Sequence, residues 1–532
     1  MDSLVDQLQP GPEASPSGPG PMAGAGRRSD LDLLAPLPTP LRRHAIDMAL
    51  GRADDARLTA FLAEDDPLRA LIAWFGEDLR QMPKGTALAG LIDRDIAFLD
   101  ELLTDQLNAV LHHERFRALE ASWRGLAYLG ACAASAQKVV VRVLNLSWSE
   151  VCADFDRASD FDQSHLFGKV YNEEFGMPGG LPYGVLLCDY QVQHRPTLDH
   201  PTDDVAGLAG LAGVAAAAFA PAILGASPRM LGLDSFSELS HLPSLSGLYR
   251  GAEYARFERL RGTDDVRFLG LVLPRVLMRK PYTQDGVAGV GFRYREDLRG
   301  LTEDDMCWGS AVYPFGEVLI RAFDLHGWFA DICGTRRDEI DNGLVTGIQA
   351  PSAETDTPGV VDRFGSELAI ANQTEFDLWQ MGFMTVNVCK DTPYLVFHSS
   401  PSIQKVPQGG HSAANVNARL SAMLRYILCV SRFAHYAKVK IRDRIGAYVN
   451  AEACERDLQT WLHSYCLGND DAGPDMKARF PLREASVEVK AVPSRPGTFA
   501  CVMHLRPHFQ LDQIFTTFKL VTDVAIAASR TG

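Results

Sequence analysis

Between residues 139 and 400, two kinds of apolar pattern alternate along the chain. Short, mostly apolar runs are typical of buried strands, and helical spacing lies between them near 163–175, 203–220, 235–260 and 305–326. The strand-like runs are Val139–Leu146, Gly184–Tyr190, Phe268–Leu273, Trp328–Cys333, Phe383–Cys389 and Tyr394–His398. This alternation predicts an α/β fold in which helices cover a sheet. We place the α/β domain or domains at 131–410, with a surface loop near 335–366.

The chain before this region shows helical patterns and no convincing strand. Residues 1–40 form a Pro- and Gly-rich arm that we expect to be flexible. Helical spacing covers 41–82, and an apolar stripe at steps of three and four residues runs from Ile92 to Val110. The region 41–130 is therefore predicted to be helical. A short apolar segment in the arm is a candidate partner-binding segment, with residues Leu31, Leu33 and Leu34.

The C-terminal region, 411–532, combines helical patterns at about 413–449 and 451–466 with a pattern of period two. Apolar and polar residues alternate on both sides of a turn at Pro493–Gly497, which predicts a β-hairpin with one apolar face. The apolar positions of this hairpin are Val487, Val489, Phe499, Cys501, Met503 and Leu505.

A hairpin of two strands is marginally stable alone in water, and its free edges accept strands from other chains. Two interpretations are open at this point. The hairpin interlocks neighbouring subunits of an assembly, together with the N-terminal arm, or it completes the sheet of its own domain.

Charge argues against a nucleic-acid-binding protein. The chain has 52 basic and 67 acidic side chains, a net charge of −15, whereas nonspecific binding of nucleic acid needs a basic surface. One basic cluster contains Arg432, Lys438, Lys440, Arg442 and Arg444. Because Asp443 interrupts it and a helix spreads these positions over several faces, we expect it to pair with acidic residues of this or a neighbouring subunit.

The cysteines and the longest uncharged stretch indicate a compartment. The ten cysteines include no C-x-x-C pair, so we expect buried thiols in a reducing cytosol. The stretch Val205–Ala226 carries no charge and is long enough to span a bilayer. Its Gly and Ala content, Pro221 and the preceding Asp203 and Asp204 favour a buried helix over a membrane span.

Sequence signatures of catalysis are missing. The chain has no phosphate-binding G-x-x-x-x-G-K-[ST] loop, no G-x-S-x-G elbow and no H-E-x-x-H motif. The adjacent His112 and His113 would point about 100° apart on a helix, so they are poorly placed to share a metal. We therefore expect no enzymatic activity and no cofactor or metal, with a soluble α/β hydrolase as a minor alternative.

Several short stretches are more specific, because they occur in the order of one known family. They are LEASWRGL at 119–126, FDQSHLF at 161–167, YGVLLCDY at 183–190, LDSFSEL at 233–239, LVLPRV at 271–276, WGSA at 308–311, SRFAHY at 431–436 and LRPHFQL at 505–511. Over about 91–524 the chain resembles the TssC/VipB-like family, the large subunits of type VI secretion sheaths.

The resemblance implies a mixed α/β fold with phage-tail-sheath-like domains, a helical N-terminal region and the C-terminal hairpin. It implies a structural subunit that polymerises with a small sheath subunit into stacked hexameric rings. This sheath would surround the inner-tube hexamers, rest on a baseplate and contract to propel the tube for effector delivery. A further implied partner is an AAA+ unfoldase that disassembles contracted sheath, with 31–37 as its candidate site.

Two regions depart from the family pattern, residues 1–90 and 335–366. The departures are typical of a divergent branch or a paralogue, and they leave open whether the chain is the main subunit or an accessory paralogue. A phage-tail-like sheath or baseplate component is the alternative function that the sequence leaves open.

Overall fold

The computed structural model of the chain describes most of the region between residues 61 and 508. The described residues are 61–75, 86–177, 179–242, 244–245, 247–282, 292, 294–296, 306–336, 339–348, 350, 364–389, 392–406, 418–443, 451–469, 471–491 and 499–508. They fall into two units, one made of residues up to Leu107 with Gln284–Arg295, the other of Asn108–Thr283 and residues from Glu296 onward.

The first unit is helical where it is described. It contains α3 (Pro67–Phe75) and most of α4 (Thr86–Leu111). Trp74 fixes α3 to α4, because its indole N–H donates to Asp95 Oδ2 at 2.8 Å. The predicted helical spacing is confirmed in these ranges, although Ile96 of the apolar stripe is 50% exposed. The candidate segment Leu31, Leu33 and Leu34 lies outside the described residues.

The second unit is built on a six-stranded sheet with the strand order β1-β2-β3-β7-β8-β6. The strands are β1 (Leu186–Val192), β2 (Ala222–Ala226), β3 (Leu269–Leu273), β7 (Phe383–Val388), β8 (Leu395–Phe397) and β6 (Leu344–Val345). The first four are parallel, and β8 pairs antiparallel with both β7 and β6. This sheet confirms the predicted α/β fold, with β1, β3, β7 and β8 close to the expected ranges.

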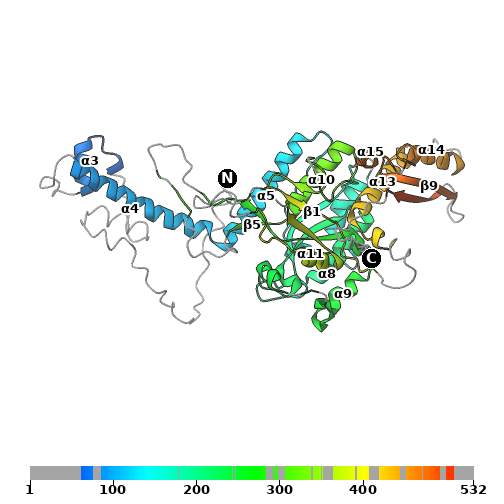
Figure 1. Ribbon diagram of the computed structural model, residues 1–532, viewed down its shortest axis with the longest axis horizontal. Coiled ribbons are helices and arrows are strands. Elements are labelled where there is room, and N and C mark those ends of the chain that lie inside the picture. Colours follow the sequence, from blue (N-terminus) through cyan, green and yellow to red (C-terminus); the bar gives the residue numbers. More distant parts are fainter. Residues whose placement is uncertain are drawn as a thin grey trace, which may run out of the picture. The chain divides into compact units, whose positions relative to one another are not determined.

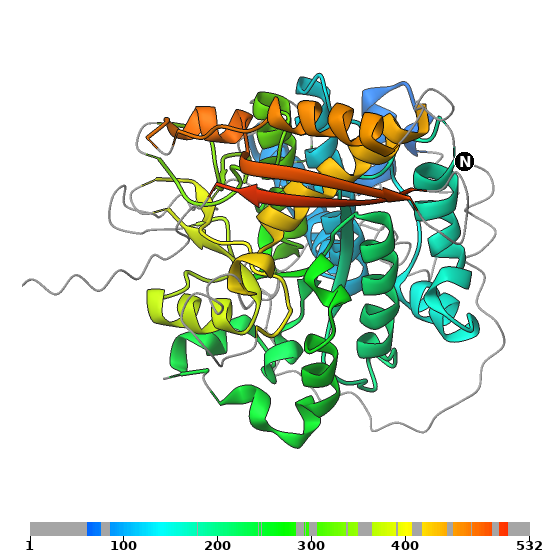
Figure 2. The same ribbon diagram turned by 90° about the vertical axis from the view of Figure 1, so that its right-hand side faces the viewer.

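Both faces of this sheet are buried, as its continuous apolar strands require. Successive residues alternate between two cores, so Leu224 and Leu271 belong to one core while Ile223 and Val272 belong to the other. Helix α8 (Asp204–Ala218) contributes to the first core, and α10 (Val312–His326) and α13 (Leu424–Asp443) contribute to the second. Figures 1 and 2 show these helices around the sheet.

The other elements of this unit surround that framework. The α-helices are α5 (Glu114–Ser135), α6 (Trp148–Arg157), α7 (His165–Phe167), α9 (Ala255–Arg261), α11 (Asn372–Gln380), α14 (Ala451–His463) and α15 (Pro474–Arg479). The other helical segments are η3 (Phe161–Gln163), the π-helix η4 (Gly168–Gly176), η5 (Pro228–Leu231), η6 (Phe236–His241), η7 (Leu248–Arg250), η8 (Ala252–Tyr254) and η9 (Asp265–Phe268). Two small antiparallel sheets pair β4 (Val276–Arg279) with β5 (Cys307–Gly309), and β9 (Leu482–Ala491) with β10 (Phe499–Pro507).

The Gly- and Ala-rich stretch after Asp203 is a buried helix, as predicted, but only as far as Ala218. Asp203 caps α8, and the Trp148 indole N–H donates to the buried Asp204 at 2.7 Å. The glycines allow close approach of aromatic rings, since a Cβ at Gly210 would lie 2.5 Å from the ring of Phe155. No helix in the described part of the chain is long and apolar enough to cross a membrane.

Five expectations about secondary structure are wrong. The stretch near 335–366 is not a surface loop throughout, because Leu344–Val345 forms β6, a buried strand of the six-stranded sheet. Phe219 takes a left-handed conformation (φ 52°) and Pro221 follows, so α8 ends and Ala222–Ala226 forms β2 instead of extending the helix. The 235–260 range contains short 3-10 turns before α9 rather than continuous helix. Residues 328–333 are largely buried but form no strand, and their side chains pack into two cores, with the Trp328 ring stacked on Phe433 at a centroid distance of 4.1 Å. Residues 139–146 also form no strand and are largely exposed.

The ten cysteines are free thiols, of which three are buried and seven half-buried, so the expectation of buried thiols holds only in part. The predicted domain boundaries at residues 40, 130 and 410 stay predictions.

Candidate assembly interface

The predicted C-terminal hairpin is confirmed as a separate two-stranded sheet. Strands β9 and β10 pair antiparallel, with Val487 opposite Met503 and Val489 opposite Cys501. The hairpin is not part of the six-stranded sheet. The structure therefore does not show the hairpin completing the sheet of its own domain, which was one of the two interpretations that the sequence left open.

One face of the hairpin packs against helices of the same chain. Val487 and Val489 are 8% and 7% exposed and join Leu458 and Leu462 of α14 in one core, together with Phe433 of α13. The inward side chains of β10 that pack against this core are Cys501, Met503 and Leu505. Burial raises the pKa of the Cys501 thiol, with the Cys454 and Glu455 side chains acting in the same direction. The side chain of Phe499 lies outside the described residues.

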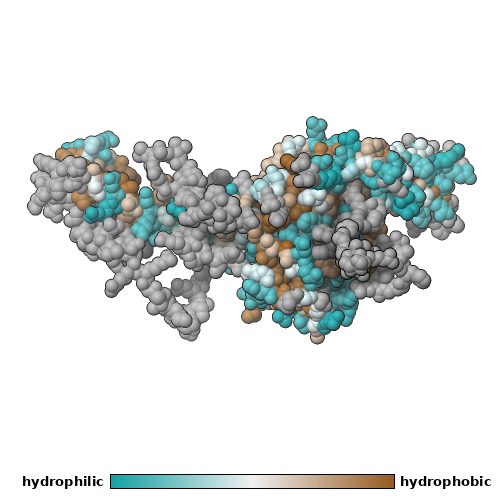
Figure 3. Space-filling model, in the orientation of Figure 1, coloured by the Kyte–Doolittle hydropathy of each residue, from teal (hydrophilic) through white to brown (hydrophobic). Residues whose placement is uncertain are grey.

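The opposite face of the hairpin is polar. Val502 is 48% exposed, and His504 and Arg506 are exposed beside it. Arg506 pairs across the strands with Glu484 at 3.1 Å, and both side chains are more than half exposed. In Figure 3 the end of the molecule where β9 and α14 lie in Figure 1 is mostly hydrophilic.

The outer edge of β9 is covered by α14, which lies along the hairpin in Figure 2. The main-chain N–H of Val487 donates to Gln459 Oε1 at 2.8 Å, and Gln459 Nε2 donates to the Ala485 carbonyl at 2.9 Å. The N–H of Val489 donates to Glu455 Oε2 at 2.9 Å. Side chains from one face of α14 therefore take the place of a neighbouring strand.

The outer edge of β10 has no such cover among the described residues. Because the N–H groups of Val487 and Val489 point away from β10, their partners Met503 and Cys501 occupy non-hydrogen-bonded pairs of the ladder. In such pairs the N–H and C=O groups of both residues point outward. Cys501, Met503 and Leu505 thus present main-chain groups along one open edge, which is the arrangement that strand addition needs.

Sequence reasoning located the hairpin but missed Glu455 and Gln459, which decide which edge is open. Their spacing of four residues places them on one helix face. That signal alone does not reveal that the face meets the edge of a strand.

The basic cluster is brought together only in part. Arg432 lies over the rings of Phe323 and Tyr436, Lys438 lies 3.4 Å from the centre of the Phe175 ring, and Lys440 lies over Trp461. These cations have aromatic partners within the chain. The side chains of Arg442 and Arg444 lie outside the described residues, and pairing of the cluster with acidic residues of a neighbour stays a prediction.

No group of three or more His, Cys, Asp or Glu side chains suited to holding a metal occurs in the described part of the chain. The isolated histidines have structural partners: His398 lies 3.0 Å from the buried Glu375, and His435 Nε2–H donates to the Ala218 carbonyl at 2.8 Å. Burial lowers the pKa of His435 to about 4. The feature of the C-terminal region that points to a function is the open edge of β10, which is typical of a protein that assembles by strand addition.

Comparisons with known proteins agree with this class. Residues 93–404 match the family model described as EvpB/VC_A0108, tail sheath N-terminal domain, and residues 413–524 match that of the tail sheath gpW/gp25-like domain. The chain is 35% identical over 439 residues to the type VI secretion system sheath protein TssC1 of Pseudomonas aeruginosa, covering 82% of this chain and 86% of that protein.

A solved structure of an anti-feeding prophage baseplate is a distant neighbour, with 9% identity and a TM-score of 0.33. It covers 60% of this chain and 66% of that chain, and carries no weight at this similarity. The two family models together span most of the sequence. The chain belongs to the EvpB/VipB tail sheath family, and the expected resemblance is confirmed.

Proposed function

We propose that the chain is the large subunit of a type VI secretion sheath, and that the open edge of β10 joins it to its neighbours in the polymer. The observation that carries the proposal is the one-sided hairpin, whose β9 edge is covered by Gln459 and Glu455 while the β10 edge has no described partner. A strand from a neighbouring subunit adds to β10 through main-chain hydrogen bonds.

Such a joint suits a sheath that contracts. Main-chain hydrogen bonds along a strand hold two subunits together while the rest of their contacts rearrange. Contraction needs two packings of the same subunits with different interface energies. A head-to-tail contact whose rotation does not close generates a helical filament.

The finer partners belong to the same proposal. The small sheath subunit co-assembles with the chain in the bacterial cytoplasm, and stacked hexameric rings surround the inner tube above a baseplate. The sheath acts by assembly and contraction and not as an enzyme. The unfoldase site at Leu31, Leu33 and Leu34 stays a prediction.

The test is co-expression with the small sheath subunit, followed by electron microscopy. Cys501→Pro removes one outward N–H of β10 and leaves the ladder to β9 intact, because the amide of Cys501 does not pair with β9. Cys501→Ala is the matched control, since it removes the thiol and keeps the amide. We expect tubules with the wild type and Cys501→Ala, and folded protein without tubules for Cys501→Pro. Normal tubules from Cys501→Pro would rule out the β10 edge as the joint.

A further inference from the structure

Residues 139–146 have the sequence of a strand and are not in one. The segment reads Val-Val-Val-Arg-Val-Leu-Asn-Leu and is rich in β-branched residues. Val140, Val143 and Leu144 are 77%, 64% and 56% exposed. Apolar side chains gathered on an exposed strand-like segment mark an interaction surface.

The main chain of this segment is available for pairing. No N–H or C=O group of residues 139–145 has a hydrogen-bond partner in the described part of the chain. The segment lies beside β1, which is an edge strand of the six-stranded sheet, but the two make no ladder. A side-chain hydrogen bond joins them, because the Tyr190 hydroxyl donates to the Leu146 carbonyl at 2.6 Å.

Both ends of the segment are fixed, so it is held extended. At one end, the N–H groups of Gln137 and Lys138 donate to Asp324 Oδ1 at 2.9 and 3.2 Å. In the middle, Arg142 pairs with Glu174. At the other end, Ser147 caps α6. An edge that is already ordered loses less conformational entropy when a strand adds to it.

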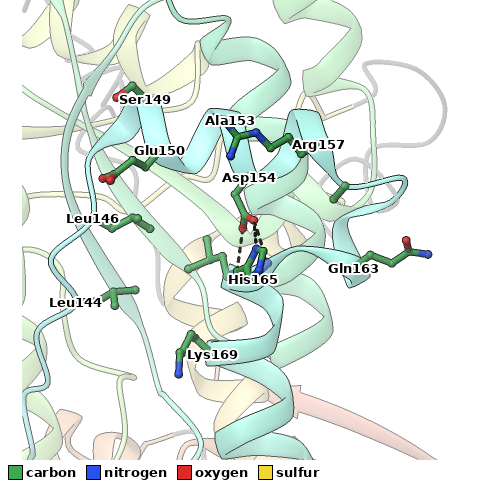
Figure 4. A pocket seen from close by; sticks show the side chains of 12 residues that line it. Leu144, Leu146, Ser149, Glu150, Ala153, Asp154, Arg157, Gln163, His165 and Lys169 are labelled. Atoms are coloured by element: carbon green, nitrogen blue, oxygen red, sulfur yellow. Dashed lines mark hydrogen bonds and ion pairs between the residues drawn. The ribbon is translucent and has the colours of Figure 1, made fainter.

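A cleft of about 600 Å³ opens beside the second half of the segment (Figure 4). Leu144 and Leu146 line it from the segment, and Leu166 lines it from α7. This apolar lining can accept side chains that project from an added strand.

One charge beside the cleft favours an acidic side chain in the occupant. Glu150 is held in the capping box of Ser147, and Asp154 accepts from the N–H groups of His165 and Leu166 at 3.1 and 3.0 Å. These contacts hold the two acids of the lining, which keep their negative charge, and the lining cation Lys169 pairs with Glu173 at 2.6 Å. Arg157 is exposed, with no partner among the described residues.

We propose that residues 139–146 are a second strand-docking edge, and that its occupant is an extended segment of the small sheath subunit. This segment places alternate apolar side chains in the cleft and an acidic side chain near Arg157. The inference rests on the proposed function, because that function supplies the partner, but it uses a different edge of the chain.

A second copy of this chain suits the edge less well. Pairing of 139–146 with the same segment of another copy is isologous and closes a dimer, whereas a sheath needs contacts that continue. The open β10 edge of another copy carries His504 and Arg506 on its exposed face, and Arg506 has the same sign as Arg157.

The direct test is hydrogen–deuterium exchange of the full chain, alone and in complex with the purified small subunit. We expect the amides of 139–146 to exchange rapidly in the free chain and at least tenfold more slowly in the complex. Unchanged exchange in a complex that forms would overturn the inference. Protection in the free chain that grows with its concentration would assign the edge to a second copy and also overturn it.

Substitutions make the test independent of exchange. Leu144→Lys should weaken binding of the small subunit at least tenfold, and Leu198→Lys, at a leucine that is fully exposed elsewhere, should change it less than twofold. Arg157→Glu should also weaken binding. Equal affinity of all three variants would refute the docking edge.

The two proposals fail in different ways. If the wild-type pair forms no tubules, the proposed function fails. If tubules form and 139–146 stays unprotected within them, only the second docking edge fails.

Discussion

Two glycines of α5 provide a matched test of how tightly the helices pack beside the sheet. Gly125 is buried and faces α10, where a Cβ would lie 2.3 Å from two ring carbons of Tyr313. Gly130 is exposed, and nothing lies within 4 Å of the Cβ position. The two glycines lie five residues apart in one helix. Replacing either one by alanine therefore improves helix propensity by the same amount, about 1 kcal/mol.

The Tyr313 ring cannot move away without loss. It is 7% exposed, and its hydroxyl donates to Asp189 Oδ2 at 2.7 Å. Overpacking costs about 1–3 kcal/mol, and loss of a hydrogen bond to a charged group costs about 1.5–3 kcal/mol. After subtracting the propensity gain of about 1 kcal/mol, Gly125→Ala should lower the free energy of unfolding by about 1.5–5 kcal/mol. Gly130→Ala should raise it by about 1 kcal/mol.

Urea unfolding of both variants measures this difference, provided that the slope of the free energy against urea is unchanged. Equal midpoints for the two variants would show that α5 and α10 do not pack as described. A Gly125→Ala variant more stable than the wild type would show the same.

Three further outcomes are expected. Burial holds the pKa of His435 at about 4 in the folded chain, whereas an unfolded histidine takes up its proton below about pH 6.5. The free energy of unfolding should therefore fall by about 3 kcal/mol between pH 7 and pH 4. Acid titration should show a shallower fall for His435→Phe than for the wild type. Gln459→Ala uncovers Val487 N–H and should destabilise the chain by about 1–2 kcal/mol and speed exchange of that amide, as followed by mass spectrometry. Burial raises the pKa of Asp331 to about 6, and the nearby Arg336 lowers it in opposition. Arg336→Met should raise the pKa of Asp331 further, which penalises the folded chain only where the carboxyl is ionised. Urea unfolding should therefore show a larger loss of stability for this variant at pH 8 than at pH 5.

The α/β fold could be predicted because its core strands are continuous apolar runs between amphipathic helices. Leu269–Leu273 is buried along its whole length, and so is almost all of Phe383–Val388. Period alone could not separate β2 from α8, since Ala222–Ala226 is as apolar as the helix before it. The left-handed Phe219 that divides them is a property of the folded chain.

The other wrong assignments have a tertiary cause. The apolar residues of 328–333 fill cores and not a ladder: Trp328 stacks on Phe433 of α13, and Phe329 and Ile332 lie in the core beside the sheet. Residues 139–146 have the composition of a strand, but no described strand pairs with them. A sequence pattern predicts that a segment is suited to a β-sheet. It does not predict whether, or from where, a neighbouring strand pairs with it.

The same limit applies to the candidate interface. Alternation along 485–506 predicts the hairpin and its buried face, because side-chain direction follows from period two. Which edge is open depends on side chains of α14, more than 20 residues away in the sequence.

The covered edge of β9 has a consequence for assembly. A hairpin with two open edges could accept a strand on either side, and subunits joined in this way could branch or pair at random. With Gln459 and Glu455 along β9, the β10 edge is the one described edge of this hairpin that is open to strand addition. If 139–146 accepts a different strand, the two joints are of unlike kind and lie on different parts of the chain. A joint in which the β10 edge receives a strand from a different part of a neighbouring chain is head-to-tail, and head-to-tail contacts whose rotation does not close build an open helical tube instead of a closed dimer.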